Sequence, residues 1–282
     1  MTIEFYKSDL KKIPKYIELY KRCFKKYPLN KNYQYFEWLY KKNPSGEFIG
    51  IDAFDTEKGL EIGQVGGVPY IFNYLGTNIK ILQSINVCVD KNYRGQKLFK
   101  KMASKLEAYA KEHNYNLIIA IANAQATPAW INSISMNFLS KLDVFLTYNL
   151  SEIEKLNMSD KIFRSLWDEK LINWRKSNPS NPAKTFKGHK IKLTSSSVLS
   201  IFKVFSFIEN NNFTINYNNN EINILPNLFL GLLPKKIRGM HIKIPDILKP
   251  SPLNFLYKDL SQQNLKIIKE NCYFSYLDFD AY

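Results

Sequence analysis

The chain of 282 residues is long enough for one large domain or two smaller ones, each with a buried core. Its hydrophobic content of 45% and aromatic content of 15% exclude a disordered protein, and no apolar run approaches the roughly 18 residues of a membrane-spanning helix. The formal net charge of +15 favours anionic partners such as nucleotide-sugars, RNA or a membrane surface, but does not choose among them.

The cysteines and histidines predict neither disulfides nor a metal site. Cys23, Cys88 and Cys272 are odd in number and far apart, which is typical of a reduced chain. The three histidines are too scattered to form a metal site. Because the first residues also lack the pattern of a signal peptide, we expect a cytoplasmic protein.

The N-terminal part predicts one helix, an aromatic-rich segment and three strands. Residues 8–26 carry apolar side chains at mostly helical spacing, and the aromatic-rich segment Tyr33–Lys42 ends in a turn at Asn43-Pro44-Ser45-Gly46. Asp55–Gly59 is typical of a hairpin loop, and Pro69 is expected to end the strand that follows this loop. The strands are predicted over Phe48–Ala53, Leu60–Val68 and Asn78–Val89.

The stretch Val87–Phe99 predicts a strand, a turn and the start of a helix. A helix N-terminus offers unpaired backbone N–H groups and the positive end of the helix dipole. Arg94 and Lys97 add positive charge there, and Gly95 lets the backbone turn sharply. Such a turn suits a pyrophosphate. An ordinary solvated turn between a strand and a helix remains the alternative.

A second strand follows this helix. The helical pattern extends from Lys97 to His113, and Leu117–Ala122 is typical of a buried strand, with Asn123 at its end and a second short helix near Pro128. A strand–helix–strand unit this short implies a right-handed crossover between parallel strands. We predict Asp143–Asn149 as a returning strand that completes the domain.

These residues resemble the GNAT (GCN5-related) acyltransferases. The acyl-CoA site of that family is a strand, a turn of pattern Arg/Gln-x-x-Gly-x-Gly/Ala, a helix and a second strand that ends in Asn. Tyr93–Phe99 matches the Tyr-Arg-Gly opening, the spacing and the leucine, and Ile121–Trp130 is similar to the family's later series. The resemblance covers roughly residues 12–150. The family usually has small residues at three positions that here are Lys97, Phe99 and Asn137.

The resemblance implies an α/β fold with a mixed sheet and acetyl-CoA as co-substrate, without a metal. The strand backbone would pair with the pantetheine arm, and N–H groups of the turn and the helix would hold the pyrophosphate. The residues implied to bind acetyl-CoA are Val87, Cys88, Val89, Arg94, Gly95, Gln96, Lys97, Leu98, Phe99 and Asn123. Two alternatives stay open: Asn123 as a helix cap, and Cys88 as a small hydrophobic strand residue.

The resemblance further implies direct transfer of an acetyl group to a primary amine. The family's tyrosine acid falls on Trp130, which has no labile proton to donate, so the catalytic residues are unknown. Asn86, Glu37 or an ordered water are candidates. The residues expected to line the acceptor are Tyr35, Trp38 and Tyr40, with Glu37 beside them; packing is the alternative for Trp38.

The second half is expected to be another α/β unit, so the predicted domains are residues 1–150 and 151–282. The sequence from Trp38 to Asn43-Pro44-Ser45 recurs, one residue shorter, from Trp174 to Asn178-Pro179-Ser180. We interpret this as a weak internal repeat: a degenerate second GNAT-like half that has lost the CoA turn and shapes the acceptor pocket. Coincidence in an Asn-rich chain is the alternative. The further elements predicted here are a helix over Ser159–Trp174, strands with a turn over Thr185–Leu193, and a final strand over Tyr273–Asp280.

Long GNAT chains of this style resemble enzymes that acetylate amino sugars for surface polysaccharides, so the expected acceptor is a small anionic amine such as a nucleotide-linked amino sugar. Two other functions stay open. A Fem-like aminoacyl transferase has two GNAT halves but uses charged tRNA, and its positive charge would contact phosphates; nucleic acid is otherwise not expected. A non-enzymatic module with a decayed CoA site is the second. The sequence leaves the acyl group, the specific acceptor and the oligomeric state open.

Overall fold

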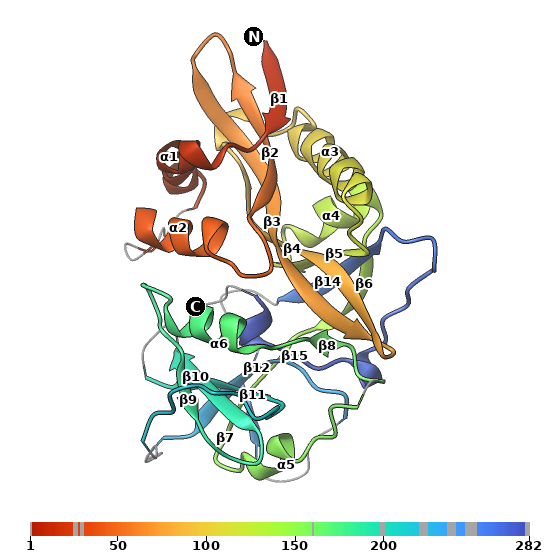
Figure 1. Ribbon diagram of the computed structural model, residues 1–282. Coiled ribbons are helices and arrows are strands. Elements are labelled where there is room, and N and C mark those ends of the chain that lie inside the picture. The colour runs from red at the N-terminus through yellow and green to blue at the C-terminus, as the bar shows by residue number, and fades with distance from the viewer. Residues whose placement is uncertain are drawn as a thin grey trace. The chain divides into compact units, whose positions relative to one another are not determined.

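The structure is a computed structural model, in which residues 2–24, 28, 31–159, 161–197, 201–219, 225–235, 241–245 and 253–279 are described (Figure 1). Its internal contacts divide the chain into two compact units. The first comprises Met1–Tyr70, Lys80–Phe138 and Asn254–Leu265, and the second Ile71–Ile79, Leu139–Leu253 and Lys266–Tyr282. This division differs from a single boundary at residue 150, because a late segment counts with the first unit and residues 139–150 count with the second.

Two helices cover one side of the first sheet. The helix α1 (Ile13–Cys23) follows a 3-10 turn, and α2 (Tyr33–Lys41) begins where the Asn32 side chain accepts a hydrogen bond from the Tyr35 N–H, at 3.2 Å. Both helices bury an apolar and aromatic face, and α1 carries Lys15 and Lys21 on its exposed side. This arrangement confirms the helix predicted over 8–26 and makes the aromatic-rich segment a helix.

The first sheet has the spatial order β1-β2-β3-β4-β5-β14-β6, with β8 (Arg164–Ser165) paired to the end of β3. Its main strands are β1 (Ile3–Lys7), β2 (Ile49–Asp55), β3 (Leu60–Tyr74), β4 (Thr77–Val89), β5 (Leu117–Ala122), β6 (Asn137–Lys141) and β14 (Asn254–Asp259). The prediction that Pro69 ends its strand was wrong. Pro69 lies beyond Gly67, the last residue that pairs with β2, so its missing N–H removes no hydrogen bond from that ladder.

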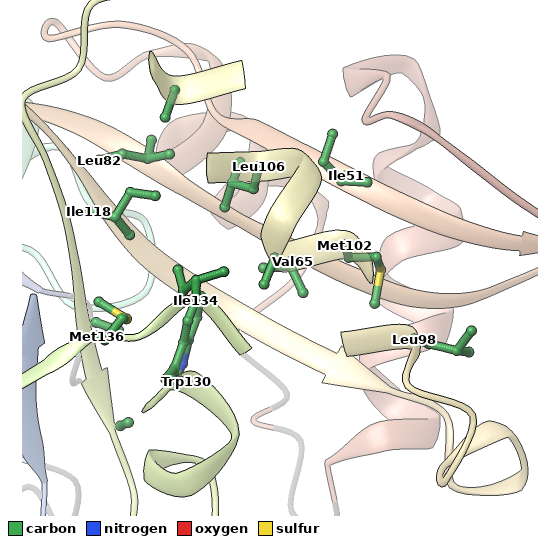
Figure 2. Close-up of a cluster of buried hydrophobic side chains, with 14 of the residues drawn as sticks. Ile51, Val65, Leu82, Leu98, Met102, Leu106, Ile118, Trp130, Ile134 and Met136 are labelled. Carbon is green, nitrogen blue, oxygen red and sulfur yellow. The ribbon is translucent and has the colours of Figure 1, made fainter. Parts of the chain in front are cut away.

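The predicted crossover is present. Helix α3 (Leu98–Glu112) connects β4 to β5, and these two strands pair in parallel. A short helix, α4 (Thr127–Ile134), follows β5. Figure 2 shows how the two helices and the sheet share one core, in which side chains from α3 and α4 pack on strand residues. The labelled core residues are Ile51, Val65, Leu82, Leu98, Met102, Leu106, Ile118, Trp130, Ile134 and Met136.

The second sheet has the order β13-β7-β12-β11-β10-β9, with β15 paired to β12. Its strands are β7 (Asp143–Thr147), β9 (Lys184–Phe186), β10 (Ile191–Ser196), β11 (Lys203–Ile208), β12 (Asn227–Leu232), β13 (His241–Lys243) and β15 (Phe274–Ser275). Two helices accompany it, α5 (Ser151–Glu154) and α6 (Glu169–Lys176). The antiparallel pair β9–β10 confirms the strands and turn predicted over Thr185–Leu193.

Three predictions for this half were wrong. The helix expected over Ser159–Trp174 is confined to α6, because Arg164 and Ser165 pair with β3 and the Asp168 side chain caps a helix that starts only at Glu169. The segment Asp143–Asn149 does form a strand, but β7 pairs in the second sheet. The predicted final strand stops after Ser275, because the Asp278 carboxylate accepts the Ser275 N–H at 2.7 Å and closes a 3-10 turn; Asp280 lies outside the described residues.

The two sheets repeat one strand order. Apart from the edge strand β1, the order β2-β3-β4-β5-β14-β6 corresponds to β9-β10-β11-β12-β7-β13. In each sheet the third and fourth of these strands are parallel, and the fifth is antiparallel to the fourth. The fifth strand is exchanged: β14 comes after β9 to β13 in sequence but belongs to the first sheet, whereas β7 comes before them and belongs to the second sheet.

The recurring Trp and Asn-Pro-Ser residues lie at equivalent places in the two units. Asp168 caps α6 as Asn32 caps α2, each accepting from the third residue of its helix. At the other end, the side-chain oxygens of Asn43 and Asn178 accept the N–H of the serine two residues later, at 3.0 and 2.9 Å. A strand follows each turn. The repeat is therefore structural.

No helix within the described ranges is long and apolar enough to cross a membrane.

The exchanged strand β14 should determine the stability of the first unit. Leu256 is fully buried in the core of Figure 2. We expect Leu256→Ala to lower the free energy of unfolding by about 2–5 kcal/mol in urea and to speed amide exchange in β5. The control Ile242→Ala, at a side chain that is 68% exposed, should change stability by less than about 0.5 kcal/mol. Equal effects of both variants would contradict this assignment of β14.

Candidate active site

The candidate site lies where β4 and β5 stop pairing. Their parallel ladder joins Ile81–Ser84 to Leu117–Ala120, and within the described residues, which include both strands completely, it goes no further. On its other side β4 stays bonded, since the Asp90 N–H still donates to the Ile62 carbonyl at 2.8 Å. Asn86 adopts a left-handed conformation with φ of 50° just beyond the last paired residue. The end of β4 is therefore a strand edge that β5 does not use.

The turn after β4 is anchored by buried groups. The Tyr93 hydroxyl donates to the Asp55 carboxylate at 2.6 Å, and the Arg22 guanidinium pairs with the Asp90 carboxylate at 2.9 Å. Arg22 also donates to the Glu61 carbonyl at 2.6 Å, which ties the last turn of α1 to β3. These contacts fix the segment that leads into the turn.

Between the buried residues Tyr93 and Leu98 the turn is exposed. Arg94, Gly95, Gln96 and Lys97 face solvent, and Leu98 is buried again as α3 begins. Gly95 has φ of 83°, which a glycine adopts without steric penalty. Lys97 has φ of 59°, a left-handed conformation that residues other than glycine adopt less often. Lys97 adds a positive charge to the N-terminus of α3.

Phe99 and Trp130 pack against each other. Their ring centroids lie 5.0 Å apart in an edge-to-face arrangement, and Trp130 is buried. Phe99 thus fills space between α3 and α4. The Asn123 side-chain oxygen accepts the Ala126 N–H at 2.8 Å, so Asn123 closes the turn ahead of α4, whose N-cap residue is Ala126. That hydrogen bond uses the Asn123 side-chain oxygen and leaves the N–H₂ group of the same side chain for a ligand contact.

Val87, Cys88 and Val89 form the end of β4. The two valines pack on the core of Figure 2, and Cys88 is buried. Burial raises the pKa of the Cys88 thiol, whereas a hydrogen bond with Cys88 lowers the pKa of Cys23. A buried thiol with a raised pKa is protonated and weakly nucleophilic, so Cys88 contributes its backbone and its volume here.

The residues expected to line the acceptor lie on α2 and separate into two groups. Tyr35 and Trp38 are buried in an aromatic cluster, and the Glu37 carboxylate pairs with the Lys42 ammonium at 3.1 Å. Tyr40 is also buried, but its hydroxyl accepts a hydrogen bond from the Asn86 side-chain amide at 3.0 Å. The structure therefore joins Tyr40 to Asn86 at the edge of β4, and no contact of the described residues does so for Glu37.

A buried polar network continues inward from Tyr40, and the sequence analysis missed it. The Tyr40 and Tyr20 hydroxyls are 2.7 Å apart, and the Tyr20 hydroxyl donates to the side-chain oxygen of Gln64. The side-chain N–H₂ group of Gln64 donates to the Asp52 carboxylate at 2.8 Å. Burial raises the pKa of Asp52 to about 6, although hydrogen bonds to its carboxylate oppose the shift. The available signal was a pair of polar residues, Asp52 and Gln64, inside two apolar strands that pair directly.

The second unit uses the equivalent position differently. There the parallel strands β11 and β12 pair only at Val204 and Leu228. The Tyr273 hydroxyl accepts the Phe207 N–H at 3.0 Å, and β15, which starts at the next residue, pairs with β12. The chain's own segment therefore bonds to both parted strands, and among the residues of the second unit that the structure describes there is no strand edge like that of β4.

Acidic and metal-binding side chains do not cluster in the described part of the chain, where no group of three or more His, Cys, Asp or Glu could hold a metal ion.

A family model described as "Acetyltransferase (GNAT) domain" matches residues 5–128. No curated protein matches the chain. Among solved structures, a probable N-acyltransferase from Enterococcus faecalis V583 is 10% identical, with a TM-score of 0.59 and 93% of this chain and 74% of that chain covered. A GCN5-related N-acetyltransferase from Kribbella flavida is 9% identical, with a TM-score of 0.57 and coverage of 92% and 71%. One from Anabaena variabilis ATCC 29413 is 8% identical, with a TM-score of 0.54 and coverage of 92% and 73%. At these identities the likeness shows the fold, and it extends over both units.

Asp52 should make stability depend on pH. The folded chain keeps a proton on this carboxyl up to about pH 6, whereas an unfolded chain releases it near about pH 4. The free energy of unfolding should therefore fall as pH rises between these values, because the folded state binds more protons there. In urea midpoints from pH 4 to 7, Asp52→Asn should lose this component of the slope. Parallel profiles for the two proteins would contradict the shift.

Proposed function

We propose that the protein is a GNAT acetyltransferase, the family whose model matches residues 5–128, and that it transfers an acetyl group from acetyl-CoA to a primary amine. The observation that carries the proposal is the unpaired edge of β4 next to an exposed basic turn at a helix N-terminus. A strand edge offers regularly spaced N–H and C=O groups, and the helix end offers N–H groups to an anion. An acyl-CoA carries partners for both, an amide-containing arm and a pyrophosphate.

The residues present fit such a ligand. The backbone of Val87–Val89 would pair with the pantetheine arm, and the N–H groups of Gln96–Phe99 would hold the pyrophosphate beside Arg94 and Lys97. Because Gly95 and Lys97 both have positive φ, the turn can present successive N–H groups on one side. The departures at Lys97 and Phe99 therefore do not argue for a decayed site.

The reaction is direct: a C–N bond forms between the amine and the acetyl carbon, the C–S bond breaks, the amine loses a proton and the CoA thiolate gains one. The chain has to orient the amine and to stabilise the developing oxyanion. Backbone N–H groups near Cys88 or Val89 lie at the strand edge and would serve the oxyanion. Burial raises the pKa of the Cys88 thiol, which favours direct transfer over a covalent route through this residue.

The acceptor that best suits the chain is a small anionic amine, such as an amino sugar or nucleotide-linked amino sugar of surface polysaccharide biosynthesis in the cytoplasm. The net charge of +15 favours such a molecule by long-range attraction. An aminoacyl transferase that uses charged tRNA would share the fold and the charge, and becomes the favoured function if acetyl-CoA does not bind.

Binding of acetyl-CoA tests the turn. We expect a micromolar dissociation constant by isothermal titration, and a loss of at least about tenfold, or about 1.4 kcal/mol, in the double variant Arg94→Ala, Gln96→Ala. The matched control is Lys105→Ala, which removes an exposed charge about two turns further along α3 and should change the affinity less than about threefold. No binding by the unmodified protein would end the acetyltransferase proposal.

The acceptor class has its own test. With saturating acetyl-CoA, a UDP-linked amino sugar and glucosamine 6-phosphate should be acetylated with a kcat/KM at least about tenfold above that of uncharged glucosamine. Because the advantage is electrostatic, it should shrink in about 0.5 M salt. Equal rates for charged and uncharged amines would leave acetyl transfer standing and overturn the anionic acceptor.

A further inference from the structure

We propose that Asn86 offers its side-chain carbonyl oxygen to the amine of the acceptor, and that a one-way chain of hydrogen bonds from Asn86 to Asp52 holds it in that orientation. The inference rests on the proposed acetyl transfer, because it concerns the same strand edge. In it Asn86 touches the substrate, and the four residues behind it, Tyr40, Tyr20, Gln64 and Asp52, are positioning residues.

The direction of this chain of hydrogen bonds is fixed at its inner end, at Asp52. A carboxylate can only accept, so the Gln64 amide must turn its N–H₂ group toward Asp52, at 2.8 Å, and its oxygen toward Tyr20. Tyr20 then uses its only proton on Gln64. The contact of 2.7 Å between the Tyr20 and Tyr40 hydroxyls can therefore be made only with Tyr40 as donor.

The same reasoning orients Asn86. The Tyr40 proton is committed to Tyr20, so the group that faces Tyr40 across 3.0 Å has to donate, and only the Asn86 N–H₂ can do so. A flipped amide would place two acceptors against each other. The Asn86 oxygen is thereby turned away from Tyr40, and no described residue donates to it. Five residues from β2, β3, β4, α1 and α2 thus leave the Asn86 side-chain oxygen as an acceptor at the strand edge.

Burial makes this orientation firm. Tyr20, Tyr40, Gln64 and Asp52 each have 0% exposure, so water does not compete for their hydrogen bonds. Asn86 itself is partly exposed and lies at the positive-φ position where β4 parts from β5. A neutral amine that donates one N–H to this oxygen keeps its lone pair for the acetyl carbon, which is the geometry that direct transfer requires.

Protonation of Asp52 should weaken this series of hydrogen bonds, because one carboxyl oxygen then becomes a donor among groups that also donate. The carboxylate is surrounded by Ser8, which follows β1, Tyr16 from α1 and Gln64 from β3, all three of which donate to it. Glu61 from β3 adds negative charge, and it is bonded to Tyr6 from β1 and to Lys12 at 3.2 Å. Tyr20 reaches Asp52 only through Gln64.

The test compares two tyrosines that each lose a buried hydroxyl. Tyr40→Phe cuts the chain next to Asn86, and Tyr16→Phe removes a donor to Asp52 that is not on the path to Asn86. With acetyl-CoA and glucosamine 6-phosphate, Tyr40→Phe and Asn86→Gly should lower kcat at least tenfold while the acetyl-CoA dissociation constant stays within twofold. Tyr16→Phe should keep kcat within threefold. Glycine is used at position 86 because it tolerates the positive φ.

A second readout needs no acceptor. In the full chain with ¹⁵N-labelled asparagine, the side-chain amide signal that Asn86→Gly removes should shift with a midpoint near the pKa of Asp52, about 6, and Tyr40→Phe should abolish the shift. Equal kcat values for Tyr40→Phe and Tyr16→Phe, or an Asn86 signal that does not change with pH, would overturn the proposed hydrogen-bond chain from Asn86 to Asp52. Acetyl-CoA binding by the unmodified protein would still stand in that case. Absence of that binding would instead overturn the proposed function.

Discussion

The exchange of one strand between the two sheets is the constraint on which the rest of this structure depends. The strand β14 covers the full length of β5, from Asn254 opposite Ala122 to Asp259 opposite Leu117. The other neighbour of β5, β4, pairs with only four of its residues. Since β5 has a complete partner on one side, it can part from β4 on the other side and still keep a full ladder. The free edge of β4 is therefore supported by residues that lie more than a hundred positions later in the chain.

The same strand order produces two different sites. In the first unit the parted strands leave a free edge beside a basic turn, and a buried network behind α2 places a single polar group, Asn86, at that edge. In the second unit the Tyr273 hydroxyl and β15 bond to the parted strands. A duplicated fold can thus keep one binding edge and fill the other with its own chain.

What the sequence could predict was local. Helix α3, the strands on either side of it and the turn at Gly95 follow from periodicity and from residues within about thirty positions of one another. The partner of β5 could not be predicted, because strand pairing depends on contacts that no local pattern records. The helix expected over Ser159–Trp174 was only partly correct for the same reason, since pairing of Arg164 and Ser165 with β3 overrode its apolar spacing. Asp52 and Gln64 were missed because a polar residue inside a strand normally faces water, and here both are buried against each other.

The most direct test of this account is amide hydrogen exchange with and without acetyl-CoA, read along the whole chain. Ligand on the free edge of β4 should slow exchange at Val87–Val89 and at Gln96–Phe99, and leave Lys203–Ile208 of β11 unchanged, because that strand is already bonded to the chain's own segment. Protection at β11, or exchange at the turn that ignores the ligand, would contradict the assignment of one open and one filled site.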